Sequence, residues 1–199
     1  MAVAVVRSRA LTGVHAPVVS VEVHLAGGLP AFNLVGLPDT EVRESRDRVR
    51  AALQNAQFDF PSRKITVNLA PADLPKESGR FDLPIALGIL AATGQIPAVA
   101  LDPYEFAGEL ALTGDLRAIR GALAMVLSAR RDGRAFILPQ SSAAEASLVR
   151  DATVYPASSL LAVCAHITGR ELLPPMAPNV PVAIDPGADL SDVRGQAQA

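Results

Sequence analysis

The chain has 199 residues, of which half are apolar and only 4% aromatic, so alanine, valine, leucine and isoleucine must fill its core. This length suits one domain with a substantial core. Small and branched apolar side chains are typical of sheets covered by helices. The formal net charge of −2 excludes a surface that is basic throughout, so any contact with nucleic acid requires a local basic patch.

The composition also indicates in which cellular compartment the protein is expected. The single cysteine, Cys164, excludes an internal disulfide and fits a reducing environment. No apolar run approaches the roughly 20 residues that span a bilayer. The first residues lack the basic and apolar regions of a secretory signal. We therefore expect a cytoplasmic protein without a membrane partner.

The chain opens with β-prone segments. Residues 18–25 alternate in polarity, which predicts a strand with one buried face; that face carries Val19, Val21, Val23 and Leu25. A turn at residues 27–30 leads to a third strand at residues 31–35. Because no crossover helix separates these strands, we predict that residues 2–12, 18–25 and 31–35 form an antiparallel meander.

A helix follows this meander. Asp39 or Thr40 can cap its first turn, and Val42, Val49 and Leu53 recur at helical spacing, which predicts the buried stripe. The arginines Arg43, Arg46 and Arg50 lie off that stripe. They form the first candidate patch for DNA.

Alternating elements make up the rest of the domain. A strand at residues 64–69 and a loop at residues 70–80 precede a helix at residues 82–93 that is apolar all round and must be buried. We expect Asp82 to cap that helix. Between residues 106 and 168 strands and helices alternate, which predicts parallel, right-handed βα units and an α/β (α+β) fold.

The composition changes after residue 170. Five prolines fall between residues 174 and 186 with few large apolar residues, which is typical of an extended linker. We therefore divide the chain into a domain over residues 1–170 and a proline-rich linker over residues 171–199.

A search for catalytic motifs finds little. The phosphate-binding Gly-x-x-x-x-Gly-Lys-Ser/Thr pattern is missing, the three histidines are scattered, and no Cys-x-x-Cys pair exists. We therefore expect no metal and no cofactor in this chain. Ser78 lies close to Lys76, but no third group orients a dyad, and we interpret the serine as a loop hydroxyl bonded locally. Lys76 and Arg80 instead suggest a flexible cationic loop.

Three segments resemble a known family. They are Leu-Val-Gly-Leu-Pro-Asp at residues 34–39, Val-Asn-Leu-Ala-Pro-Ala-Asp-Leu-Pro-Lys at residues 67–76 and Gly-Arg-Phe-Asp-Leu-Pro-Ile-Ala at residues 79–86. Together they closely resemble the N-terminal domain of the ComM/YifB family, which comprises Mg-chelatase-like AAA+ proteins. Residues 189–196 resemble the approach to that family's ATPase domain, where the resemblance places ATP and Mg²⁺.

The same domain is similar to the proteolytic domain of Lon proteases and to domain 2 of ribosomal protein S5. By this resemblance Asp82 stands at the position of the Lon serine and Leu123 near that of the Lon lysine. A carboxylate and an aliphatic chain cannot provide an activated hydroxyl nucleophile. We therefore expect no catalytic residue in this chain.

The resemblance implies a hexameric, ATP-driven ring that moves along DNA, with this domain as a scaffold. We expect DNA contact through Arg43, Arg46, Arg50, Lys76 and Arg80, since phosphate binding needs only cations and donors. Acidic residues alternate with the arginines on the helix that begins near residue 40. The alternative interpretation of that helix is therefore an ordinary solvated surface. A pure oligomerisation module and a vestigial Lon-like peptidase are the other hypotheses.

Overall fold

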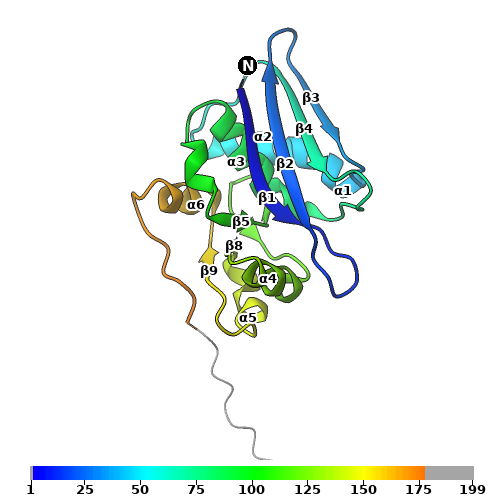
Figure 1. The fold of residues 1–199 in the computed structure, drawn as a ribbon. Coiled ribbons are helices and arrows are strands. Elements are labelled where there is room, and N and C mark those ends of the chain that lie inside the picture. The colour runs from blue at the N-terminus through cyan, green and yellow to red at the C-terminus, as the bar shows by residue number, and fades with distance from the viewer. Residues whose placement is uncertain (1, 178–199) are drawn as a thin grey trace, which may run out of the picture.

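The computed structural model describes residues 2–177, and it shows a mixed α/β fold as predicted. A four-stranded sheet forms the first half, with helices packed on one of its faces (Figure 1). Its strands are β1 Ala2–Arg9, β2 Val18–Ala26, β3 Ala31–Val35 and β4 Lys64–Ala70. The helices of this half are α1 Thr40–Arg43, α2 Ser45–Asn55 and α3 Asp82–Ala92.

The predicted meander is wrong in its last strand. The strand order is β1-β2-β4-β3, so β4 separates β2 from β3. Strand β4 runs antiparallel to β2 and parallel to β3. Helices α1 and α2 supply the crossover between β3 and β4, which makes this a βαβ unit. Strand β4 buries every second residue, and β3, which buries none, remains at the edge.

The alternation predicted for the second strand is confirmed. Strand β2 buries Val19, Val21, Val23 and Leu25, and its other residues are half-buried. The buried face packs against α3, whose residues are buried except Ala91. The prediction of an all-round apolar, buried helix is therefore confirmed. Gly88 permits this close packing, because a Cβ there would lie 2.5 Å from Val23 Cγ2.

The second half is built from parallel βα units, as predicted. Strands β5 Tyr104–Phe106, β8 Ala135–Pro139 and β9 Val154–Ala157 form a parallel sheet in the order β5-β8-β9. Helices α4 Ala122–Arg131, α5 Ala143–Ala146 and α6 Leu160–Ile167 accompany it (Figure 1). The predicted strand at residues 106–112 ends early, because the chain leaves the sheet at Gly108 and forms the hairpin of β6 Glu109–Leu110 and β7 Leu116–Arg117.

A buried ion cluster joins the two halves. Arg9 on β1 donates from Nε to Glu105 Oε2 of β5 at 2.5 Å and also pairs with Asp132. Both Arg9 and Glu105 are buried. Because a buried charge needs a partner, this pair links β1 of the first sheet to β5 of the second.

The described part of the predicted linker has no regular secondary structure, and it packs on the domain. Leu173 N donates to His166 Nδ1 at 3.1 Å, and Met176 N donates to Val154 O at 2.8 Å. Residues 178–199, with the rest of the predicted linker, lie outside the described residues. The domain boundary at residue 170 stays a prediction.

Candidate nucleic-acid interface

The first candidate arginines lie where the sequence predicts them. Asp39 Oδ1 accepts a hydrogen bond from Val42 N at 2.8 Å and caps α1. The predicted single helix is broken at Glu44, where α1 ends and α2 follows. The stripe of Val42, Val49 and Leu53 is buried. Arg43, Arg46 and Arg50 are exposed on the outer side.

These three arginines line two adjoining hollows beside the edge strand β3. One hollow, of about 340 Å³, contains Phe32, Arg46, Arg50, Phe60 and Arg63. The other, of about 400 Å³, contains Phe32, Arg43 and Arg46. We call the combined surface the arginine groove; its defining residues are Phe32, Arg43, Arg46, Arg50, Phe60 and Arg63.

Sequence reasoning missed Arg63 and the two aromatic side chains. Arg63 precedes β4, outside any helix, so helical spacing gives no signal for it. Arg50 Cζ lies 5.1 Å from the centre of the Phe60 ring, a cation–π contact that places a cation beside an aromatic side chain. Positively charged grooves with aromatic side chains are typical of proteins that bind single-stranded nucleic acid.

Acidic residues only partly neutralise the arginine groove. Asp47 pairs with Arg46 at 3.1 Å, with both side chains exposed, and an exposed pair contributes only about 0–1 kcal/mol. Glu44 pairs with Arg48 and not with an arginine of the groove, with 3.6 Å between Glu44 Oε2 and Arg48 Nη1. Within residues 2–177, Arg43, Arg50 and Arg63 form no ion pair with an acidic side chain. The groove therefore keeps an excess of positive charge.

The prediction of a flexible cationic loop at Lys76 and Arg80 is wrong. Lys76 is 1% exposed and Arg80 4% exposed. Lys76 Nζ donates to Pro71 O, and Arg80 Nε donates to Glu77 O and to Ser78 Oγ. Because both side chains are buried and bonded within this segment, neither cation presents a surface to a DNA backbone.

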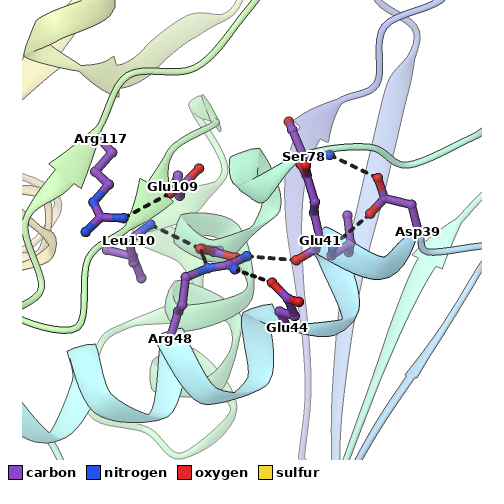
Figure 2. Close-up of polar contacts among 10 residues, drawn as sticks. Asp39, Glu41, Glu44, Arg48, Ser78, Glu109, Leu110 and Arg117 are labelled. Atoms are coloured by element: carbon purple, nitrogen blue, oxygen red, sulfur yellow. Dashed lines mark hydrogen bonds and ion pairs between the residues drawn. The ribbon is translucent and has the colours of Figure 1, made fainter.

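Asp82 does not cap α3 as expected. Its carboxylate accepts from Arg48 Nε at 2.6 Å, from Arg48 Nη2 at 3.1 Å and from Leu110 N at 3.1 Å (Figure 2). Phe81 occupies the cap position without a side-chain bond. The carboxylate joins α2, α3 and β6, and that is its structural role.

The side chains of Asp82 and Leu123, the two positions compared with Lon from the sequence, are engaged in packing and hydrogen bonding. Asp82 is fully buried, and burial raises its pKa to about 6, although Arg48 and Leu110 N–H act in the opposite direction. Leu123 lies on α4 with its side chain partly exposed, and its N–H donates to Glu145 Oε1 at 3.0 Å. Ser78 Oγ accepts from Arg80 and is not bonded to Lys76. These groups offer no hydroxyl activated by a neighbouring amine.

The described residues offer no group of three His, Cys, Asp or Glu side chains that could hold a metal ion. Cys164 is buried, and burial raises the pKa of its thiol to about 12. The sequence also lacks a phosphate-binding loop for ATP. No helix in the described part of the chain is long and apolar enough to cross a bilayer.

Comparison with known proteins identifies relatives over most of the chain. A family described as subunit ChlI of Mg-chelatase matches residues 21–142. Competence protein ComM of Haemophilus influenzae is 55% identical over 174 residues, which cover 87% of this chain and 34% of that protein. Proteins named YifB from Salmonella typhimurium and Escherichia coli are 49% and 48% identical over the whole chain and 39% of their own length. The chain thus spans between a third and two fifths of these relatives.

Proposed function

Because this chain belongs to the ComM/YifB family and carries its ChlI-type Mg-chelatase domain, we propose that it is a non-catalytic module that contacts nucleic acid for an ATP-driven ring. The motor, with ATP and Mg²⁺, would lie in the part of the relatives' length that this chain does not span. The hexameric ring and the movement along DNA belong to this proposal as well.

The arginine groove is the observation that carries the proposal. Four arginines line one concave surface, and among residues 2–177 only Arg46 has an ion-pair partner on it. Cations on a rigid scaffold bind phosphates without reading sequence. Of the five cations proposed from sequence for DNA contact, the structure leaves Arg43, Arg46 and Arg50 accessible.

A fluorescence-polarisation titration tests this. The 199-residue chain is titrated into a labelled oligonucleotide at low salt, beside a variant with Arg43→Glu, Arg46→Glu and Arg50→Glu. We expect the variant to lose at least about tenfold in affinity, because three phosphate contacts become repulsive. A control variant reverses three exposed arginines outside the groove, Arg131, Arg150 and Arg170, and changes the net charge equally. Equal losses in both variants would reduce the effect to overall charge and contradict the proposal.

A second candidate is a self-association module that leaves DNA to the motor. It is supported by the uncovered face of the four-stranded sheet (Figure 1), where Val3 and Val5 on the outer strand β1 are 62% and 49% exposed. Exposed apolar side chains on an edge strand favour pairing with another chain. For this candidate, sedimentation of the chain would show self-association that Val3→Glu with Val5→Lys abolishes, and the arginine variant would bind DNA like the wild type.

The peptidase hypothesis has a direct test as well. A casein turnover assay on the chain and on its Asp82→Ser variant should detect no hydrolysis in either. Because position 123 is a leucine, a serine at position 82 would have no lysine amine from that position to activate it. Turnover by the variant would show that another group in the chain serves as the base.

A further inference from the structure

Residues 172–177, which we call the strap, lie on the surface of the second half. The strap follows α6 and runs past β9 (Figure 1). Leu173 N donates to His166 Nδ1 at 3.1 Å, and Met176 N donates to Val154 O at 2.8 Å. The side chains of Leu173 and Met176 are half-buried against the two hydrophobic core clusters. The strap is therefore held at two points, and one of them is a titratable side chain.

Pro174 and Pro175 lie between these two points. Proline fixes φ at about −65° and has no N–H, so this pair donates no hydrogen bond of its own. A stiff spacer also loses little conformational freedom when the strap docks. Because so few bonds hold the strap, the loss of one shifts the balance towards an open form.

His166 can hold the strap only while its imidazole is neutral. The neutral ring has one N–H donor and one acceptor nitrogen, whereas the charged ring has two donors. Because Nδ1 accepts from Leu173 N, the proton of the neutral ring is on Nε2. Protonation would place a second N–H on Nδ1, opposite the N–H of Leu173, and would abolish this hydrogen bond.

The surroundings of His166 also disfavour the charged ring. His166 is 6% exposed, and its Nε2 is closed to solvent without a hydrogen-bond partner among residues 2–177. Two tyrosines pack against the ring from the sheet. The ring centre of Tyr155 on β9 lies 4.6 Å away, and that of Tyr104 on β5 lies 5.4 Å away. A charged imidazole in this place would have neither water nor an anion beside it.

The charged and titratable groups near His166 do not change this balance. Burial lowers the pKa of His166 from its ordinary 6.5, and no side-chain charge among the described residues opposes that shift. Glu105 of β5 is bonded to Arg9. The strap carries no titratable side chain. Burial raises the pKa of the Cys164 thiol on α6 to about 12, so the thiol stays neutral. Protonation of His166 is therefore coupled to release of its ring from this place.

We propose that His166 and the strap form a proton-controlled latch, closed while the imidazole accepts from Leu173 and opened when Nδ1 takes a proton from solvent. Opening frees six residues, which extend over about 20 Å of chain, between α6 and the residues that follow 177. Under the function proposed above, this length would set how far the domain can move from a motor attached after the strap. The latch itself does not depend on that function, because none of its residues lines the arginine groove.

NMR of the ¹⁵N-labelled 199-residue chain tests the latch, because one titration reports both the imidazole and the strap. Between about pH 7.5 and about pH 4, the order parameters of the Leu173 and Met176 amides should fall from about 0.85 to below about 0.6. The midpoint should lie below 6.5 and coincide with the change in the His166 Nδ1 signal. A strap that stays ordered over the whole range, or a midpoint above 6.5, would overturn the proposal.

His166→Asn separates this histidine from other groups that titrate in the same range, such as Asp82 with its pKa of about 6. Asparagine keeps an oxygen near the place of Nδ1 and takes up no proton, so the strap should stay ordered throughout. His24→Asn is the matched control, since it removes a histidine on β2 and should open like the wild type. If the strap of His166→Asn also opens in acid, another group controls it and the proposal is wrong.

Leu173→Pro provides an independent test if His166→Asn folds poorly. Proline removes the N–H that His166 accepts and leaves the imidazole in place. We expect low order parameters for the Met176 amide at every pH in this variant. The titration midpoint of His166 should rise towards 6.5, because a closed strap and a neutral ring favour each other reciprocally. An unchanged midpoint would show that the bond to Leu173 does not hold the ring neutral, and would contradict the latch.

Discussion

The protonation of Asp82 should control stability between acid and neutral pH. Its carboxylate is fully buried, and burial raises its pKa from the ordinary 3.8 to about 6. The difference corresponds to about 3 kcal/mol of preference for the neutral form in the folded protein. Because the folded protein holds this proton more tightly than the unfolded chain, the stabilisation is complete below pH 3.8 and is lost as the pH rises through about 6.

The Asp82→Asn variant isolates this contribution. Asparagine cannot ionise, keeps an oxygen that can accept from Leu110 N, and leaves Arg48 with Glu44 at 3.6 Å. Urea unfolding of both proteins, from about pH 4 to about pH 7.5, gives the difference in free energy of unfolding at each pH. We expect the variant to gain about 2 kcal/mol relative to the wild type over that range, because at pH 4 Asp82 of the unfolded chain is already more than half ionised.

Two outcomes of this urea experiment would contradict the prediction. If the difference does not change with pH, or if the wild type gains on the variant as the pH rises, the bonds from Arg48 and Leu110 outweigh burial. Asp82 would then be an ordinary ionised partner of Arg48, and the reasoning from desolvation would be wrong.

Three further predictions concern the stability of the fold, each measured by urea unfolding. Glu105→Gln leaves Arg9 buried without its main partner and should cost about 3–5 kcal/mol; a loss below 1 kcal/mol would show that the pair does not join the halves. Gly36→Ala places a Cβ 2.2 Å from Leu69 O at φ 100°, so we expect a loss of about 2 kcal/mol or more, and unchanged stability would contradict that close approach. Asp39→Ala removes the cap of α1 and should cost about 1 kcal/mol, whereas no loss would show that water caps this helix equally well.

Local features of the fold could be predicted from the sequence. The alternation of Val19, Val21 and Val23 depends on residues only a few positions apart, and it is confirmed. The predicted cap by Asp39 or Thr40 is equally local, and the structure shows that Asp39 provides it. The order of the strands could not be predicted in this way. Whether β3 pairs with β2 depends on β4, which begins 29 positions after the end of β3. No local pattern indicates that β4 inserts between them.

In the candidate site, too, local features could be predicted from the sequence and long-range contacts could not. Helical spacing separates Arg43, Arg46 and Arg50 from the buried stripe, so their exposure could be predicted. The burial of Arg80 could not, because prolines and glycine around it are typical of an exposed loop. The bond between Arg48 and Asp82 joins positions 34 residues apart, and only the packing of α2 on α3 brings them together.

The salt dependence of DNA binding tests the central claim most directly. Each phosphate contact to a single strand adds about 0.7 to the slope of log K against log salt. A variant with Arg43→Gln, Arg46→Gln and Arg50→Gln should therefore bind single-stranded DNA with a slope about 2 smaller than that of the wild-type chain. Equal slopes for the two proteins would show that the arginine groove does not contact the nucleic acid.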